Sequence, residues 1–317
     1  MYPSKYAIFA TTVVGALLIN SAVLAGVGHT TSDHGHVPGP EVAIANQPVG
    51  GNVSAITGVG GFAGGNVGVL SGADGVLIVD SLLSGFQYKL ENVLSTLKVC
   101  SGCGDVKYLI NTHWHFDHTG TNEYFGNDAV LIAHNSVRPL LSSEQEVKAV
   151  GKVFPALKPS GLPDITFTEQ SSLYFNGEEI ELTHFPKSHT SGDVVVYFKQ
   201  SEVLHLGDLY FNGMFPFVDL EHGGNVLGMI RSVESVLQSY PADTTVIPGH
   251  GAVSGMDELR SFLMMLKETT AIVEKGKNSG MSLQLMQKQG LDEKWASWEW
   301  GFVSTKIWIT LVYNSLP

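Results

Sequence analysis

Residues 111–120 follow directly on a short apolar run, residues 106–110, and carry four potential metal ligands within six positions. The four are His113, His115, Asp117 and His118. Neutral imidazole and carboxylate are the ligands that Zn²⁺ and similar metals prefer. Along an extended segment, alternation places the first three on one side, and a turn brings His118 round to join them. We therefore predict a metal site in the loop after a β-strand.

A second set of potential ligands is spread over the second half of the chain. His189, Asp208 and His250 each lie near the end of an apolar run and close to a glycine. Glycine allows the backbone to turn sharply there and expose a side chain. Together with the first set they make seven ligands, which is the complement of two adjacent metals.

The remaining pattern predicts strands and helices that alternate twice along the chain. We expect strands at 67–70, 75–80, 106–111, 129–133, 172–175, 178–184, 193–198, 203–206 and 244–247. We expect helices at 84–98, 121–125, 135–150, 226–240 and 257–275, an irregular crossing or lid at 151–163, and a C-terminal helical segment that carries Trp295, Trp298, Trp300 and Trp308. This order suggests two similar halves, with two packed sheets covered by helices outside.

The N-terminus predicts export. Residues 1–25 have the pattern of a signal peptide that is cleaved after Ala25, with an uncleaved membrane anchor as the alternative. We expect residues 26–48 to form a flexible leader and residues 49–317 a single domain that is periplasmic or secreted. Cys100 and Cys103 favour a local disulfide over a redox pair or a metal site.

The net charge of −12 disfavours a nucleic-acid partner, because such a surface needs a basic stripe. We therefore expect a small-molecule substrate, with membrane contact only through the signal peptide or an anchor. The sequence leaves the oligomeric state open.

The His-x-His-x-Asp-His motif, with His, Asp and His downstream in that order, resembles the metallo-β-lactamase fold superfamily from about residue 53 to residue 266. The resemblance implies an α/β fold, a four-layer αββα sandwich with two metals in a cleft at one edge. It assigns His113, His115 and His189 to one metal, and Asp117, His118 and His250 to the other. Asp208 would bridge both metals, as in glyoxalase II-like and lactonase-like members. Metallo-β-lactamases proper usually have Cys or Ser at that position, so the chain looks more like the broad hydrolase branch.

These residues predict an exported hydrolase with two Zn²⁺ or other divalent ions. A hydroxide held between the metals would open an amide or ester-type bond, and Asp117 would orient it and pass a proton on. We favour a β-lactam-like substrate, with a lactonase, thioesterase or phosphodiesterase as alternatives. Two further alternatives are a non-catalytic metal-binding protein and an enzyme that resembles the persulfide dioxygenases, with one iron and with His118 and His250 off the metal.

Substrate contacts are harder to predict. Tyr210, Phe62 and His222 are the candidates, and Phe154 and Phe217 lie on loops where they would extend an apolar wall. Trp114 and Phe116 alternate with the ligands, so we expect both to point away from the metals into the core.

Overall fold

The computed structural model describes residues 41–97 and 105–317. The predicted signal peptide, the first part of the leader and both cysteines lie outside these residues. The prediction of a flexible leader is wrong at its end, because Ala43–Gly50 form strand β1, which pairs antiparallel with β2. Ile44 packs against the buried cluster beneath it, which explains why this segment is ordered into the sheet.

The first sheet combines an antiparallel half with a parallel half. Its order is β1 (Ala43–Gly50), β2 (Val53–Val59), β3 (Val67–Gly72), β4 (Gly75–Val79), β5 (Val106–Ile110), β6 (Val130–His134) and β9 (Ile165–Phe167). The pairs from β1 to β4 are antiparallel, and those from β4 to β9 are parallel. The parallel half aligns the carboxyl ends of β4, β5 and β6 at one edge.

The second sheet is mostly antiparallel. Its order is β10 (Gln170–Phe175), β11 (Glu178–Phe185), β12 (Asp193–Phe198), β13 (Val203–His205), β14 (Thr245–Ile247) and β15 (Ser254–Gly255). Only the pair of β13 and β14 is parallel among these strands. The predicted strands at 172–175 and 178–184 form a hairpin that turns at Asn176 and Gly177, both at positive φ.

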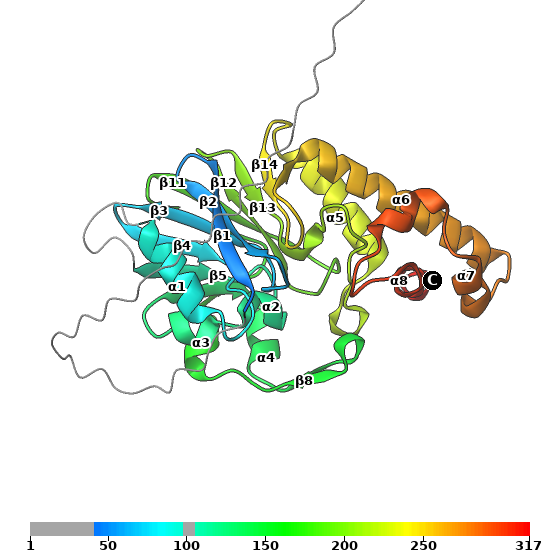
Figure 1. Ribbon diagram of the computed structural model, residues 1–317, viewed down its shortest axis with the longest axis horizontal. Helices are drawn as coiled ribbons and strands as arrows, with labels where there is room; N and C mark the ends of the chain where they lie inside the picture. The colour runs from blue at the N-terminus through cyan, green and yellow to red at the C-terminus, as the bar shows by residue number, and fades with distance from the viewer. Residues whose placement is uncertain (1–40, 98–104) are drawn as a thin grey trace, which may run out of the picture. The chain divides into compact units, whose positions relative to one another are not determined.

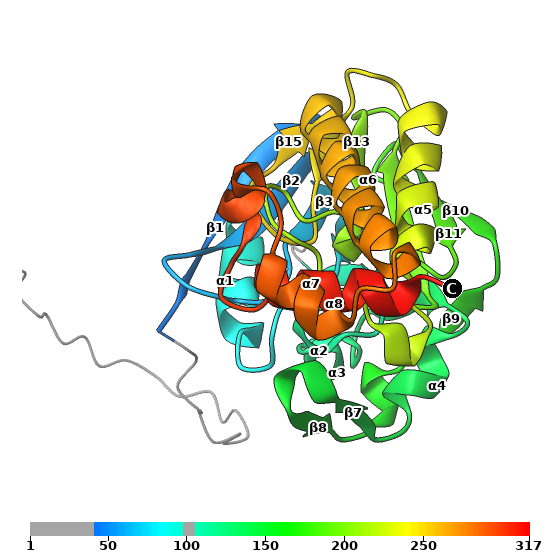
Figure 2. The ribbon, with the colours of Figure 1, turned by 90° about the vertical axis from the view of Figure 1, so that its right-hand side faces the viewer.

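Helices cover the outer faces of both sheets. They are α1 (Gln87–Thr96), α2 (Phe116–Thr119), α3 (Asn122–Phe125), α4 (Val137–Leu141), α5 (Val226–Ser239), α6 (Met256–Asn278), α7 (Leu283–Gln289) and α8 (Thr305–Ser315). Helix α1 lies on the first sheet, and α5 and α6 lie on the second (Figure 1). Figure 2 shows α5, α6 and α8 together on the outer side of the second sheet. In the described ranges, no helix combines the length and apolarity that a bilayer crossing requires.

Three buried clusters hold these layers together. Leu77 and Ile110 of the first sheet meet Leu182 and Val196 of the second in the central cluster. An outer cluster packs α1 onto the first sheet, and another packs α5, α6 and α8 onto the second. The chain is therefore a four-layer αββα sandwich, as predicted.

The predicted helix at 135–150 is wrong. Helix α4 ends at Leu141, where the hydroxyls of Ser142 and Ser143 donate to the carbonyl of Pro139 and compete with the backbone ladder. The chain then forms the hairpin of β7 (Gln145–Val147) and β8 (Lys152–Phe154). This hairpin replaces part of the irregular crossing that we expected from residue 151 onward.

Candidate metal centre

The seven predicted ligands lie at the ends of strands from both sheets. His113 and His115 follow β5, and Asp117 and His118 form the first turn of α2. His189 lies between β11 and β12, Asp208 lies in the 3₁₀ turn Gly207–Leu209 after β13, and His250 follows β14. All seven side chains are buried. The loops that carry them turn at glycines, among them Gly207, whose φ of +49° favours glycine.

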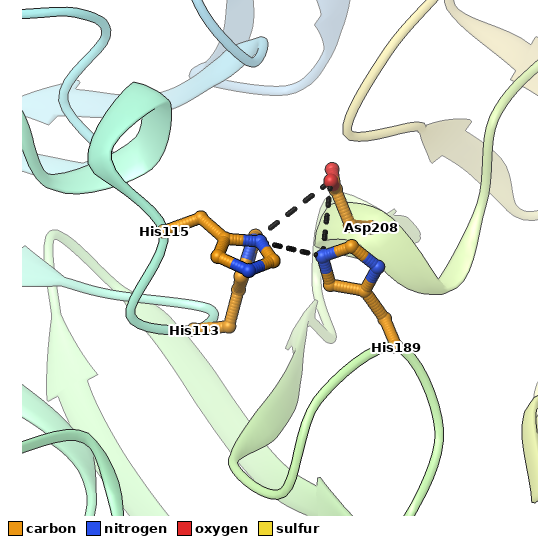
Figure 3. A group of neighbouring side chains, drawn as sticks. All are labelled: His113, His115, His189 and Asp208. Atoms are coloured by element: carbon orange, nitrogen blue, oxygen red, sulfur yellow. Dashed lines mark hydrogen bonds and ion pairs between the residues drawn. The ribbon is translucent and has the colours of Figure 1, made fainter. Parts of the chain in front are cut away.

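The first ligand group consists of His113, His115, His189 and Asp208. Nδ1 of His115 lies 3.0 Å from Nε2 of His113 and 2.8 Å from Nε2 of His189. Oδ2 of Asp208 lies 3.3 Å from the same His189 nitrogen. Figure 3 shows the three imidazoles and the carboxylate converging on one point.

The second ligand group consists of Asp117, His118 and His250. Nε2 of His250 lies 3.3 Å from Oδ2 of Asp117. Oδ1 of Asp208 lies 3.1 Å from Nε2 of His118 and 3.4 Å from Nε2 of His250. Asp208 thus presents one oxygen to each group, which is the geometry that a bridging carboxylate requires.

The positions of the ring N–H groups in the first ligand group indicate a cation between the rings. Despite burial, which alone would raise it, the hydrogen bond from His115 lowers the pKa of Asp219 to about 2, so this carboxylate only accepts. His115 therefore donates from Nε2 over 2.9 Å, and its Nδ1 carries a lone pair. Likewise Nδ1 of His189 donates to the carbonyl of Phe217 over 2.8 Å, which leaves a lone pair on Nε2. Two lone pairs 2.8 Å apart repel unless a cation lies between them.

A proton on His189 or His113 is a poor candidate for that cation. Burial lowers the pKa of His189 to about 4, and burial followed by the charges of neighbouring histidines holds the pKa of His113 well below its usual value. Three imidazoles and one carboxylate suit a divalent ion of the zinc type instead.

Negative charge predominates in the second group. Nδ1 of His118 donates to Oδ2 of Asp80 over 2.7 Å, and its Nε2 faces Oδ1 of Asp208 at 3.1 Å. That oxygen is buried and has no hydrogen-bond partner among the described residues. Although burial opposes it, the carboxylates of Asp208, Asp80 and Asp117 raise the pKa of His118 well above its usual value. This negative field attracts a cation to the second group as well.

Both groups contribute to the lining of a cavity of about 390 Å³. Its walls are largely aromatic, and the aromatic rings are those of Phe62, Phe116, Phe211, Phe217, Trp300 and Phe302. His115, Asp117, Asp208 and His250 also line it, so both ligand groups are accessible from this space. An apolar cavity with a few convergent polar groups is typical of a small-molecule site.

The predicted substrate contacts differ in whether they line the cavity. Phe62 lines the cavity, and its ring stacks on His250 with the centroids 5.7 Å apart. Tyr210 does not line it, because its ring packs on Phe262 in the core and its hydroxyl lies 3.1 Å from Oγ of Ser254. The predicted substrate contact of Tyr210 is therefore not one that this structure provides.

His222 is also placed away from the cavity. Its Nδ1 lies 2.7 Å from Oδ2 of Asp219, the same oxygen that accepts from His115. It thus belongs to the hydrogen-bond network behind a ligand, and no substrate contact follows from its position.

The aromatic neighbours of the ligands divide in the same way. Trp114 is buried, as predicted, whereas the prediction for Phe116 is wrong. Helix α2 starts at Phe116, so the strand-like alternation has already ended there and the ring lines the cavity. Phe217 lines it as expected, and Phe154 lies behind the wall, stacked on Phe116 at 4.1 Å.

Sequence reasoning missed two residues that orient the ligands. Asp80 follows β4 at the same edge as the ligand loops. Its φ of +66° lies in the left-handed region, which few residues other than glycine adopt. Its position after a strand was an available signal. Asp219 lies in a loop with no such signal, and Trp300 and Phe302 belong to a segment whose pattern indicated only helix.

The comparisons with known proteins agree with this geometry. A sequence model of the family described as "Metallo-beta-lactamase superfamily" matches residues 60–250. An uncharacterized protein of Aquifex aeolicus is 30% identical over 158 residues, which are 49% of this chain and 72% of that protein. A protein of Schizosaccharomyces pombe named a probable hydroxyacylglutathione hydrolase is 28% identical over 179 residues, which are 55% of this chain and 59% of that protein.

Solved structures share the fold at lower identity. A metallo-beta-lactamase from Pontibacter korlensis has a TM-score of 0.57 and 19% identity, and the match covers 71% of this chain and 99% of that one. A double mutant of the sec-alkyl sulfatase PisA1 has a TM-score of 0.62 and 14% identity, and the match covers 86% of this chain and 50% of that one.

Proposed function

The chain belongs to the metallo-β-lactamase superfamily of metal-dependent hydrolases, and on this premise we propose that it is an exported enzyme that binds two zinc ions and hydrolyses a carbonyl ester, lactone or amide. The observation that carries the proposal is Asp208, whose two oxygens face two separate ligand groups. Two divalent ions held by these groups would supply Lewis acidity and would lower the pKa of a water molecule towards neutrality.

Asp117 is the best candidate for the residue that handles the proton. It and Asp208 are the described carboxylates that line the cavity, and Asp208 is occupied on both sides by ligand groups. Burial would raise the pKa of Asp117, but His118 and His250 lower it, so the carboxylate is ionised at neutral pH. An ionised carboxylate at this point can orient a water molecule and accept its proton.

The rival functions predict different uses of the second ligand group. An iron enzyme with a single metal would leave His118 and His250 unligated, yet both Nε2 atoms converge on one buried oxygen of Asp208. A non-catalytic metal-binding protein has no need for an apolar cavity beside its metals. These observations favour a dinuclear hydrolase over both alternatives.

The bond that is cleaved stays a proposal. The sequence favours a β-lactam-like substrate, and the S. pombe relative is named for a thioester hydrolase of the same family. Export rests on residues 1–25, outside the described residues, and N-terminal sequencing of the secreted protein should find Gly26 first.

The test combines metal content with turnover. The mature protein should contain two zinc ions per chain and hydrolyse at least one member of a panel that holds a chromogenic cephalosporin, a lactone, an aryl ester, a thioester and a phosphodiester. Chelation should abolish turnover and zinc should restore it. Asp117→Asn should lower kcat by about 100-fold or more, whereas Asp164→Asn, an aspartate remote from the ligands, should not. One iron per chain would refute the hydrolase, and two zinc ions without turnover on any substrate would favour the non-catalytic alternative.

A further inference from the structure

The chemical class of the substrate follows from what the cavity wall contains and lacks. Six aromatic rings line it, and none of its lining side chains within 41–97 and 105–317 is Lys or Arg. The carboxylates that line it, Asp117 and Asp208, both belong to the ligand groups. Beyond the metals, a substrate therefore meets aromatic carbon and no cationic partner.

One part of this wall comes from outside the family match. Trp300, Gly301 and Phe302 line the cavity, although the matched residues end at 250. The ring of Trp300 lies 6.0 Å from that of His250, and the ring of Phe302 lies 5.3 Å from that of Phe217. This C-terminal aromatic wall, residues 300–302, therefore stands beside the second ligand group.

Hydrogen bonds fix the C-terminal aromatic wall in place. Nε1 of Trp300 donates to the carbonyl of Phe215 over 2.9 Å, and the amide of Phe215 donates to the carbonyl of Trp298 over 2.8 Å. Phe215 in turn stacks on Trp308, which is fully buried under α6. A wall that is held before the ligand arrives loses little conformational entropy on binding.

Charge decides between substrates of the same size. The positive charge of bound metals would act on the reacting carbonyl at the base of the cavity, while the remainder of the substrate lies on the rings. A carboxylate placed there would lose its hydration without gaining a partner, which is unfavourable. An alkyl or aryl group placed there is transferred out of water, which is favourable.

We propose that this cavity selects neutral esters or lactones whose acyl group is apolar, and that Trp300 and Phe302 are the residues that determine this specificity. The proposal rests on the proposed hydrolase function and adds its substrate class. It disfavours β-lactams, whose carboxylate would face the same aromatic surface, and it disfavours thioesters that carry a negative charge away from the reacting carbonyl.

Matched esters test the charge. The p-nitrophenyl esters of hexanoate and of adipate have acyl chains of equal length, but the adipate monoester carries a carboxylate at the far end. We expect kcat/KM for the hexanoate ester to exceed that for the adipate ester by about tenfold or more, and to exceed that for the acetate ester as well. Equal or faster turnover of the adipate ester would overturn the proposal while leaving the hydrolase intact.

Variants of the C-terminal aromatic wall test the residues. Phe302→Ala and Trp300→Ala should each lower kcat/KM for the hexanoate ester by about tenfold and for the acetate ester by less than about threefold. The control Tyr174→Ala removes an aromatic side chain that is 71% exposed on β10, and it should change neither. Phe62→Lys, at a ring that is 50% exposed, should raise turnover of the adipate ester. An unchanged preference for hexanoate over acetate in both wall variants would refute the assignment.

A binding measurement separates this inference from the function on which it rests. The neutral ketone 2-octanone is not hydrolysed. Its binding should quench tryptophan fluorescence in the wild-type protein, and the ketone should bind more weakly to Phe302→Ala. Failure of 2-octanone to bind overturns the apolar specificity whatever the turnover. Binding that depends on Phe302, without hydrolysis of any ester, supports the apolar cavity and refutes the hydrolase.

Discussion

Replacing Asp80 or Asp219 by asparagine should weaken the binding of one metal and leave the affinity for the other unchanged. Oδ1 of Asp80 accepts from the amide of Thr112 over 2.8 Å, and Oδ2 accepts from Nδ1 of His118 over 2.7 Å. In Asp80→Asn the amide oxygen keeps the Thr112 bond, so the new NH₂ group faces Nδ1 of His118. Two donors cannot face each other, and His118 must move its proton to Nε2. This removes the lone pair that faces the second metal.

By the same argument, Asp219→Asn should weaken the binding of the first metal. Oδ1 of Asp219 accepts from the amide of His222 over 3.1 Å, and Oδ2 faces Nε2 of His115 at 2.9 Å. The asparagine NH₂ group forces the His115 proton onto Nδ1, the atom that faces His113 and His189. The backbone tolerates the first change too, because asparagine is among the residues that adopt the positive φ of position 80.

The expected magnitude is a loss of about 10–100-fold in affinity for one metal, or about 1.4–2.8 kcal/mol. Titration of the metal-free proteins with zinc, in competition with a chromophoric chelator, gives the two stepwise dissociation constants. Asp164→Asn is the matched control, because Asp164 accepts a hydrogen bond from the amide of Leu131 and belongs to neither ligand group.

Double variants identify the metal that is affected. Asp80→Asn should add little to the loss already caused by His118→Ala, and it should keep its full effect beside His115→Ala. The reasoning fails if both single variants weaken the same ion, or if Asp80→Asn changes neither dissociation constant by more than about threefold.

Three further changes probe the support of the site and the fold. A Cβ on Gly65 would lie 2.1 Å from Cε1 of His118, so Gly65→Ala should displace that ring and weaken the second metal in the same zinc titration. Trp308→Ala should lower the free energy of unfolding by about 3–5 kcal/mol in urea, whereas its half-exposed neighbour Ile307→Ala should lower it by less than about 1 kcal/mol. Burial lowers the pKa of His134 from 6.5 to about 4, so its contribution to stability is present above pH 6.5 and is lost as the pH falls towards 4. His134→Gln should therefore reduce the acid dependence of urea unfolding, and an unchanged dependence would contradict this sign.

The seven predicted ligands lie together in the structure, and each one follows an apolar strand. The parallel pairs that include β4, β5 and β6 bring the carboxyl ends of these strands to one edge, so residues after them meet in space. The pairing of β13 with β14 does the same for Asp208 and His250. A local pattern thus encodes part of a long-range arrangement, and the packing of one sheet on the other brings the two sets together.

The hydrogen-bond partners of the ligands follow a different rule. Asp219 reaches His115 across 104 positions of sequence, from a loop whose own pattern carries no strand signal. Its role depends on where the loop lies after the sheets have packed. The failure at Phe116 has a related cause, because the change from extended chain to helix occurs one residue after His115.

The C-terminal aromatic wall shows why substrate specificity is harder to predict from this sequence than the metal chemistry. The tryptophans of the last forty residues have no strand or helix period that separates a cavity residue from a core residue: Trp308 is fully buried, whereas Trp300 lines the cavity. What separates them is the hydrogen bond from Trp300 to Phe215, 85 positions away. The ligands lie within or at the end of the matched residues 60–250, and Trp300 and Phe302 lie beyond them. Changes at residues 300–302 can therefore alter the aromatic surface that a substrate meets while the bonds that orient the metal ligands stay in place.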